Sequence, residues 1–192
     1  PKPQTPNPKP QTPNPIILTQ PINCNLTQMQ SPSSSHPILP APTGHPWIDT
    51  SLESIRVSPE TVHRIDCVVS PGGEYVLTVD MLPMEHTIYY GGKFRLEIKV
   101  NENTPEHPPS VHFSTPILHP NITEDGTVCL GILEPSGWSR HLSLHALLNS
   151  IGNMFTDPDF DYPIRPELSA LWKKDPEEYK KKVREATIKY AT

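Results

Sequence analysis

The stretch KFRLEIKV, residues 93–100, has the clearest strand pattern in the chain. Its apolar and charged residues alternate, which places Phe94, Leu96, Ile98 and Val100 on one face and Arg95, Glu97 and Lys99 on the other. Two neighbouring stretches, EYVLTVDML (74–82) and SVHFS (110–114), also have strand patterns. Gly91-Gly92 ends the connection before residues 93–100, and Pro108-Pro109 marks the loop after them. The sequence therefore predicts a run of antiparallel strands over 74–114.

Towards the C-terminus the apolar period changes from that of a strand to that of a helix. In HLSLHALLNSIGNMFT (141–156), six apolar residues share one helical face: Leu144, Leu147, Leu148, Ile151, Met154 and Phe155. RPELSALWKK (165–174) predicts a short second helix. Asp175-Pro176 supplies the N-cap and first residue of a third, with a predicted buried stripe of Tyr179, Val183, Ala186 and Tyr190.

The stretch SLESIRVSPETVHRI (51–65), upstream of the strands, is harder to assign. Its apolar residues have helical spacing, but Pro59 interrupts any helix, so it predicts a short helix or two turns. The order of a weak helix, antiparallel strands, an irregular stretch and then helices indicates an α+β fold with the helices segregated from the sheet.

The first 46 residues differ in composition from the rest of the chain. They hold 13 of the 26 prolines, no acidic residue, and a tandem repeat of PKPQTPN. Proline fixes φ and lacks a backbone donor, so we expect residues 1–46 to be a disordered or polyproline II tail. IILTQPI (16–22) is the tail's main apolar cluster and a candidate docking peptide. Residues 47–192 have the composition of one folded domain.

Charge and cysteine content exclude several classes of protein. The net charge of −5 predicts no strong pull toward nucleic acid, and the apolar runs are far shorter than the roughly 20 residues needed to cross a bilayer. Three widely spaced cysteines, Cys24, Cys67 and Cys129, argue against a disulfide framework and against a zinc site. We therefore expect no metal or cofactor, and a protein of the cytoplasm, the nucleus or both.

The stretch HPNITEDGTVCLGIL (119–133) raises the question of whether Cys129 is a buried apolar residue or a nucleophile. A lone His-Pro-Asn means little, but it occurs here within an ordered set of motifs. The set is YYGGKF (89–94), PPSVHF (108–113), HPNI (119–122), Cys129-Leu130, Trp138, DPDFDYP (157–163) and WKKDPEEY (172–179) leading to KYA. In this set the chain resembles the ubiquitin-conjugating (E2) enzyme family.

The resemblance implies both a fold and a reaction. The family fold is a four-stranded antiparallel sheet with flanking helices. An activating enzyme (E1) transfers a ubiquitin-type modifier to the cysteine as a thioester, and a substrate lysine, positioned by a ligase (E3), then attacks that thioester. A thiol suits this role because its thiolate is a strong nucleophile and the thioester stays reactive to amines.

The resemblance also gives roles to the residues of the motif. Cys129 is the expected nucleophile, against the alternative of a buried structural cysteine. Asn121 either donates to the developing oxyanion or ties the loop together. His119 is expected to brace the turn rather than to act as a base, and Pro120 to set the bend.

Several positions depart from the family pattern. Family members often have an acid directly before a Pro-Leu pair, where this chain has Tyr162. Asp161 is the nearest acid that could orient the incoming lysine, and Asp159 is the second choice. The stretches expected to contact an E3 also depart from the family pattern. In this chain the expected E3-contact residues are Glu106, His107, Ser139, Arg140 and His141. The first helix is only lightly basic, so E1 docking is expected to fall partly to the tail.

The sequence leaves alternatives open for the modifier and for the class of protein. YYGGKF resembles the neddylation branch, whereas DPDFDYP, DPEEY and KYA are more similar to the ubiquitin enzymes, which favours ubiquitin. An inactive E2-like binding module is a second hypothesis, supported by Tyr162 and the weak first helix. A scaffold that recruits polyproline-reading modules through Pro3 and Pro6, which have P-x-x-P spacing, is a third.

Overall fold

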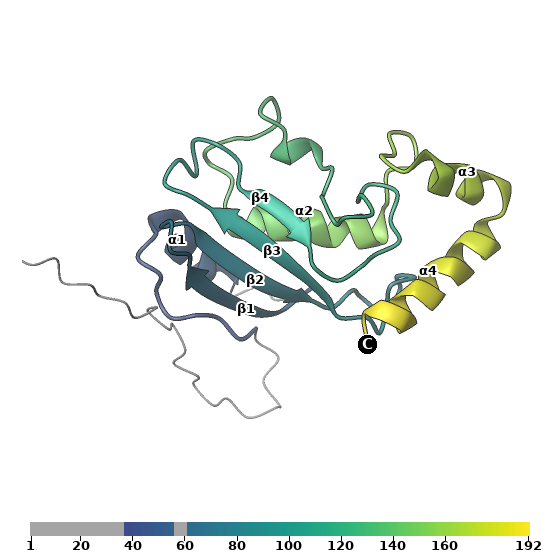
Figure 1. The fold of residues 1–192 in the computed structure, drawn as a ribbon, viewed down its shortest axis with the longest axis horizontal. Helices are drawn as coiled ribbons and strands as arrows, with labels where there is room; N and C mark the ends of the chain where they lie inside the picture. The colour runs from purple at the N-terminus through teal and green to yellow at the C-terminus, as the bar shows by residue number, and fades with distance from the viewer. Residues whose placement is uncertain (1–36, 56–60) are drawn as a thin grey trace, which may run out of the picture.

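The computed structural model describes residues 37–55 and 61–192. A four-stranded antiparallel sheet has the order β1 (Val62–Val69), β2 (Tyr75–Met81), β3 (Phe94–Val100) and β4 (Ser110–Phe113). The described helices are α1 (Pro46–Ile55), the 3-10 turn η1 (Gly131–Leu133), α2 (Leu144–Thr156), α3 (Pro166–Lys174) and α4 (Pro176–Tyr190). Figure 1 shows α1 at one end of the sheet and α3 and α4 beyond the other. The predicted α+β fold with a four-stranded antiparallel sheet and flanking helices is confirmed.

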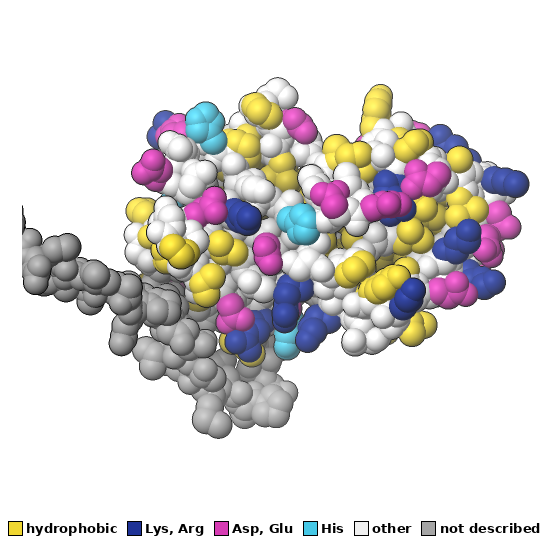
Figure 2. Space-filling model, in the orientation of Figure 1, with side chains coloured by type: hydrophobic (Ala, Val, Ile, Leu, Met, Phe, Trp, Pro, Cys, Tyr) yellow, Lys and Arg dark blue, Asp and Glu magenta, His cyan; other side chains and the backbone are white. Residues whose placement is uncertain are grey.

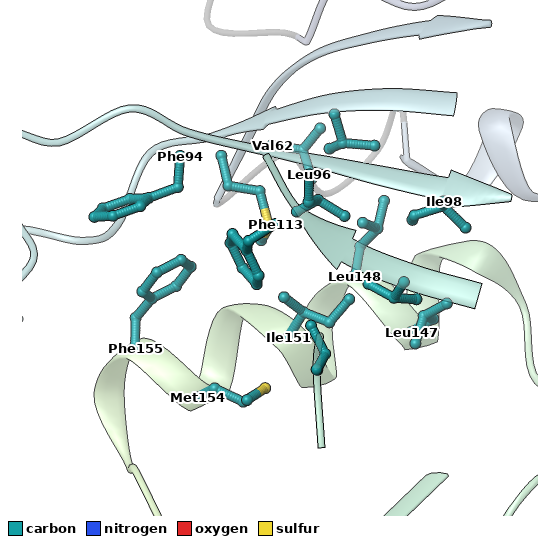
Figure 3. Packing of buried hydrophobic residues seen from close by; sticks show 14 of the residues in the cluster. Val62, Phe94, Leu96, Ile98, Phe113, Leu147, Leu148, Ile151, Met154 and Phe155 are labelled. Carbon is teal, nitrogen blue, oxygen red and sulfur yellow. The ribbon is translucent and has the colours of Figure 1, made fainter. Parts of the chain in front are cut away.

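The core lies between one face of the sheet and α2. All four apolar residues predicted on the inner face of β3 are fully buried, and every residue of the predicted apolar face of α2 is buried. Figure 3 shows Leu147, Leu148 and Ile151 of α2 facing Leu96 and Ile98 of β3. Alternation in the strand and the 3.6-residue period in the helix therefore meet in a single apolar layer.

The last helix begins as predicted but has a different buried stripe. The Asp175 side chain accepts a hydrogen bond from the Glu178 N–H (3.0 Å), which is the expected N-cap. Tyr179 and Val183 are buried, but Ala186 is only half-buried and Tyr190 is 47% exposed. The stripe continues through Thr187 instead. Because α4 lies beyond the end of the sheet, only a narrow side of it is covered.

None of the described helices has the length and apolarity needed to span a bilayer.

The assignment of residues 51–65 to a short helix or two turns was wrong in its second half. Helix α1 ends at Ile55, residues 56–60 lie outside the described part, and β1 begins at Val62. A β-bulge between Val62 and Arg64 shifts the register of β1 against β2. Val62 and Ile65 both face the core as a result, although they are three residues apart. The bulge therefore gives two core-facing residues of a strand the i, i+3 spacing that is typical of a helix.

The folded domain extends further toward the N-terminus than residue 47. Residues 1–36, including IILTQPI, lie outside the described residues, so the tail prediction stays a prediction there. Ile38 pairs in parallel with β1: its N–H donates to the His63 carbonyl (3.0 Å), and its carbonyl accepts from Ile65 (2.7 Å). The Asp49 carboxylate accepts hydrogen bonds from both Thr43 and Gly44. The segment 37–46 is therefore part of the domain.

Candidate active site

A short hairpin joins the two parts of the motif that the sequence separates by eight residues. Ile122 and Val128 form an antiparallel bridge, and the Cys129 N–H donates to the Asn121 carbonyl (2.9 Å). The His-Pro-Asn turn and the cysteine therefore lie side by side.

Glycine at the turn of this hairpin allows it to rest on β4. Gly126 has a φ of +95°, and a Cβ there would lie 2.1 Å from the Phe113 carbonyl oxygen. The Phe113 N–H donates to the Gly126 carbonyl (2.8 Å), which fixes the hairpin to the sheet. A side chain at residue 126 is excluded both by the left-handed backbone and by the close approach.

The Cys129 side chain is exposed, whereas Val128 before it is buried. Among the described cysteines, Cys67 is the one that packs in the core, at 4% exposure in β1. The alternative that Cys129 is a buried structural residue is therefore wrong. Cys129 is therefore the described cysteine that is exposed to solvent.

His119 is fully buried, and both of its ring nitrogens are occupied. Nδ1 accepts from the Asn121 N–H (3.0 Å), which leaves Nε2 to donate to the Met154 carbonyl at the end of α2 (2.9 Å). The ring also packs 5.8 Å from that of Tyr89. With no free nitrogen facing solvent, His119 braces the turn and has no geometry for a general base.

Pro120 joins the turn to the segment before α3. Its side chain is buried, and its carbonyl accepts from the N–H groups of Ile164 (2.9 Å) and Arg165 (3.0 Å). The bend at Pro120 therefore aims a backbone acceptor at the loop 157–165.

The Asn121 side chain ties that loop to the hairpin. Its Oδ1 accepts from the Asp159 N–H (2.9 Å), and its Nδ2 donates to the carbonyls of Asp159 (2.8 Å) and Tyr162 (3.4 Å). Both amide hydrogens are engaged, and the residue is 6% exposed. Of the two roles expected for Asn121, the loop tie is the one these contacts describe.

The two candidate acids have different environments. Asp159 Oδ1 accepts from the N–H groups of Asp161 (2.9 Å) and Tyr162 (3.0 Å), so this carboxylate shapes the loop. The Asp161 carboxylate is 85% exposed and lies 3.8 Å from Lys173 Nζ. Tyr162 contacts Asn121 through its backbone only, and its side chain is 83% exposed. Both residues are exposed, but only the Asp159 carboxylate is used to shape the loop.

The residues predicted to contact an E3 lie on one exposed surface. All five of them are exposed: Glu106, His107, Ser139, Arg140 and His141. Arg140 forms an ion pair with Glu106 (3.2 Å), and Trp138 Nε1 donates to the Pro105 carbonyl (2.7 Å). Two stretches more than 30 residues apart are therefore joined across this surface.

Arg165 is a residue of the site that sequence reasoning missed. It is mostly buried, and its guanidinium pairs with Glu124 of the hairpin (3.2 Å) and with Glu167 in the first turn of α3 (2.9 Å). Arg165 therefore fastens the hairpin to the loop beside it. The proximity of Arg165 to Glu167 is visible in sequence, but nothing in the pattern points to Glu124, 41 residues away.

Burial of His119 predicts a pH-dependent stability. Desolvation, partly opposed by the bond to Met154, lowers the pKa of His119 from 6.5 to about 4. In the unfolded chain His119 is therefore protonated below about pH 6.5, whereas in the folded chain it is protonated only below about pH 4. The contribution of the neutral, buried His119 ring to the free energy of unfolding is complete above pH 6.5 and declines as the pH falls. From this group alone, we expect the free energy of unfolding to fall by about 3 kcal/mol between pH 7 and pH 4.

The matched variant for this measurement is His119→Gln, which removes the titrating group. Urea unfolding at a series of pH values should give a steeper decline for the wild type than for the variant, whose absolute stability is lower because buried hydrogen bonds are perturbed. Parallel profiles for the two proteins, or an imidazole that titrates near pH 6.5 by NMR, would contradict the buried neutral ring.

Two comparisons with known proteins agree with this geometry. Residues 49–187 match the family model described as ubiquitin-conjugating enzyme. Among solved structures, the chain is similar to the E2 domain of a Toxoplasma gondii ubiquitin conjugating enzyme, with 27% sequence identity and a TM-score of 0.59. That similarity covers 67% of this chain and 88% of the other. The matched region includes the hairpin, the loop 157–163 and most of α4.

Proposed function

The chain belongs to the ubiquitin-conjugating enzyme family, and from this premise we propose that it carries a modifier on Cys129 and transfers it to lysine. The observation that carries the proposal is the exposed Cys129 side chain beside the Asn121 turn. In the first step the Cys129 thiolate attacks the thioester of the charged E1, the new C–S bond forms, and the E1 thiolate leaves.

In the second step a neutral lysine amine attacks the thioester carbonyl of the modifier. The Cys129 thiolate leaves, an isopeptide bond forms, and the proton of the amine passes to a nearby base or to water. The support for Asp161 as the residue that orients the amine is its exposed carboxylate on the loop that Asn121 holds. The 3.4 Å contact from Asn121 Nδ2 to Tyr162 is the longest of its three, so it is the bond that can yield to let the amide donate to the oxyanion.

We propose ubiquitin as the modifier, ahead of the ubiquitin-like modifier of neddylation. The support is the likeness of the DPDFDYP, DPEEY and KYA stretches to ubiquitin enzymes. The proposed partners are an E1, an E3 on the surface joined by Glu106 and Arg140, and a protein substrate that presents a lysine. A reducing compartment, the cytoplasm or the nucleus, suits an enzyme that depends on a free thiol.

The test is to incubate the full chain with ATP, each modifier and its matched E1, and to separate the products on non-reducing gels. A reductant-sensitive adduct with ubiquitin, mapped by mass spectrometry to the Cys129 peptide, supports the proposal. An adduct with the neddylation modifier alone reassigns the branch. No adduct with either modifier favours the inactive binding module, which the exposed Tyr162 in the usual acid position also supports.

The role of the N-terminal tail is tested by deleting residues 1–36. The deletion stops there because Ile38 pairs with β1, and removal of 1–46 would damage the sheet edge. We expect thioester discharge to free lysine to stay within about twofold of the full chain, since the active-site contacts lie within 119–165. Helix α1 carries Asp49 and Glu53 and no basic residue, so slower charging by E1 is expected if the tail helps to dock it. A loss of discharge to free lysine would instead place the tail in the catalytic step.

A further inference from the structure

One lysine of the chain already lies beside the acid that is proposed to receive the substrate lysine. Lys173, near the end of α3, has its Nζ 3.8 Å from Asp161 Oδ1, and the two side chains are 65% and 85% exposed. Figure 2 shows basic and acidic side chains intermingled over the end of the molecule that α3 and α4 form. Lys173 therefore has the freedom of a surface side chain and lies beside the proposed amine-orienting acid.

The helix that carries Lys173 is fixed to the active-site loop by two contacts. The Ser169 hydroxyl donates to the Phe160 carbonyl (2.8 Å). The Phe160 ring stacks on Trp172, with ring centres 4.9 Å apart and planes 7° from parallel. Lys173 follows directly after Trp172, so its backbone position relative to the loop is set by packing. Movement of its amine needs only rotation about the bonds of the side chain.

The same loop is joined in turn to the cysteine. Asn121 holds the backbone of Asp159 with hydrogen bonds of 2.8 and 2.9 Å, and its carbonyl accepts from the Cys129 N–H. A continuous set of short contacts therefore leads from Cys129 through Asn121 and the loop to Asp161 and Lys173. The segment that carries Asp161 and Lys173 is therefore held to the same turn as Cys129.

Four of the other lysines near the C-terminus are held in contacts of their own. Lys180 pairs with Glu177 (2.7 Å), Lys181 and Lys182 lie within 4.0 Å of Glu178, and Lys189 lies over the Tyr190 ring. Among the described ion pairs, only that of Lys173 joins a lysine to the loop 157–163. This contact distinguishes Lys173 from the other described lysines near the C-terminus.

We propose that Lys173 is a self-modification site, the acceptor to which a modifier carried on Cys129 is transferred within the same molecule. The inference rests on the proposed function, which supplies the thioester. The neutral Lys173 amine attacks the thioester carbonyl, the C–N bond forms, and the C–S bond to Cys129 breaks. The proton passes from the nitrogen to Asp161 or water, and Cys129 is released as a thiolate. The product is an isopeptide-linked modifier on α3, beside the mouth of the site.

The experiment is a single-turnover discharge of the full chain without any added amine. The protein is charged with E1, ATP and modifier, ATP is then removed, and the reductant-resistant adduct is followed with time. We expect one adduct of one modifier, mapped by mass spectrometry to Lys173, with a first-order rate that does not depend on protein concentration. Lys173→Arg should lower this rate at least ~10-fold, because the oriented amine is lost. The matched variant Lys174→Arg, one residue along the same helix, should leave the rate unchanged.

Thioester formation gives a separate readout for the proposed function. The Lys173 proposal is overturned if the reductant-sensitive thioester forms but decays only by hydrolysis. It is also overturned if the adduct maps elsewhere or persists in Lys173→Arg. In each of these cases the proposed thioester function still holds. A rate that rises in proportion to protein concentration, or transfer from charged Lys173→Arg to an uncharged Cys129→Ala acceptor at the wild-type rate, overturns the intramolecular step. If no thioester forms, the proposed function and this inference fail together.

Discussion

Replacement of Cys129 by serine is expected to abolish the reductant-sensitive adduct with the modifier and to leave an adduct that resists reductant in its place. The serine hydroxyl would occupy the same exposed position after the Asn121 hairpin, but it would form an oxygen ester rather than a thioester. Oxygen esters are not cleaved by thiols, and alkoxide is a poorer leaving group than thiolate, so transfer to lysine should stall. The measurement is a gel with and without reductant, followed by treatment with alkali, which cleaves the ester.

The other two cysteines supply the controls. Cys67 is buried in β1, and Cys24 lies outside the described residues. Cys67→Ala and Cys24→Ala should both keep the reductant-sensitive adduct, the first with some loss of stability because it opens space in the core. Persistence of that adduct in Cys129→Ser, or its loss in Cys24→Ala, would place the acyl group on a different sulfur and remove Cys129 from the reaction.

The regular elements could be predicted wherever local pattern and burial agree. Strand β3 alternates and α2 has a broad apolar face because each packs one whole side against the other. Strand β1 was missed because its bulge puts Val62 and Ile65 on the same side, a spacing that a helix also produces. The Pro-rich composition up to Pro46 likewise hid the pairing of Ile38 with β1, which depends on backbone groups and not on side-chain type.

The residues of the candidate site also divide into those that could be predicted from the sequence and those that could not. The motif residues His119, Asn121 and Cys129 were found from the family resemblance, and the hairpin explains why a fixed spacing brings them together. The contacts made by long surface side chains were not predictable. The Arg165–Glu124 and Lys173–Asp161 pairs depend on where the loop 157–165 lies in three dimensions. No periodic signal in the sequence encodes a contact of that kind.

Asn121→Ala is expected to separate the two halves of the reaction. Charging of Cys129 should continue, because alanine keeps the backbone carbonyl that accepts the Cys129 N–H and the sulfur remains exposed. Transfer to lysine should fall by roughly 10²–10³-fold, the usual cost of removing an oxyanion donor. The measurement is single-turnover discharge of the preformed thioester to lysine at several concentrations, which separates binding of the amine from the chemical step.

The variant Asp159→Ala distinguishes an oxyanion donor from a simple loop tie. It removes the carboxylate that holds the N–H groups of Asp161 and Tyr162 and so loosens the loop, but it leaves the Asn121 amide in place. If Asn121 acts as a donor, Asp159→Ala should lose much less activity than Asn121→Ala. Equal losses in the two variants would mean that Asn121 acts only by holding the loop. Wild-type discharge in Asn121→Ala would remove both roles, and Asp161 would then have to work from a loop that needs no support from the hairpin.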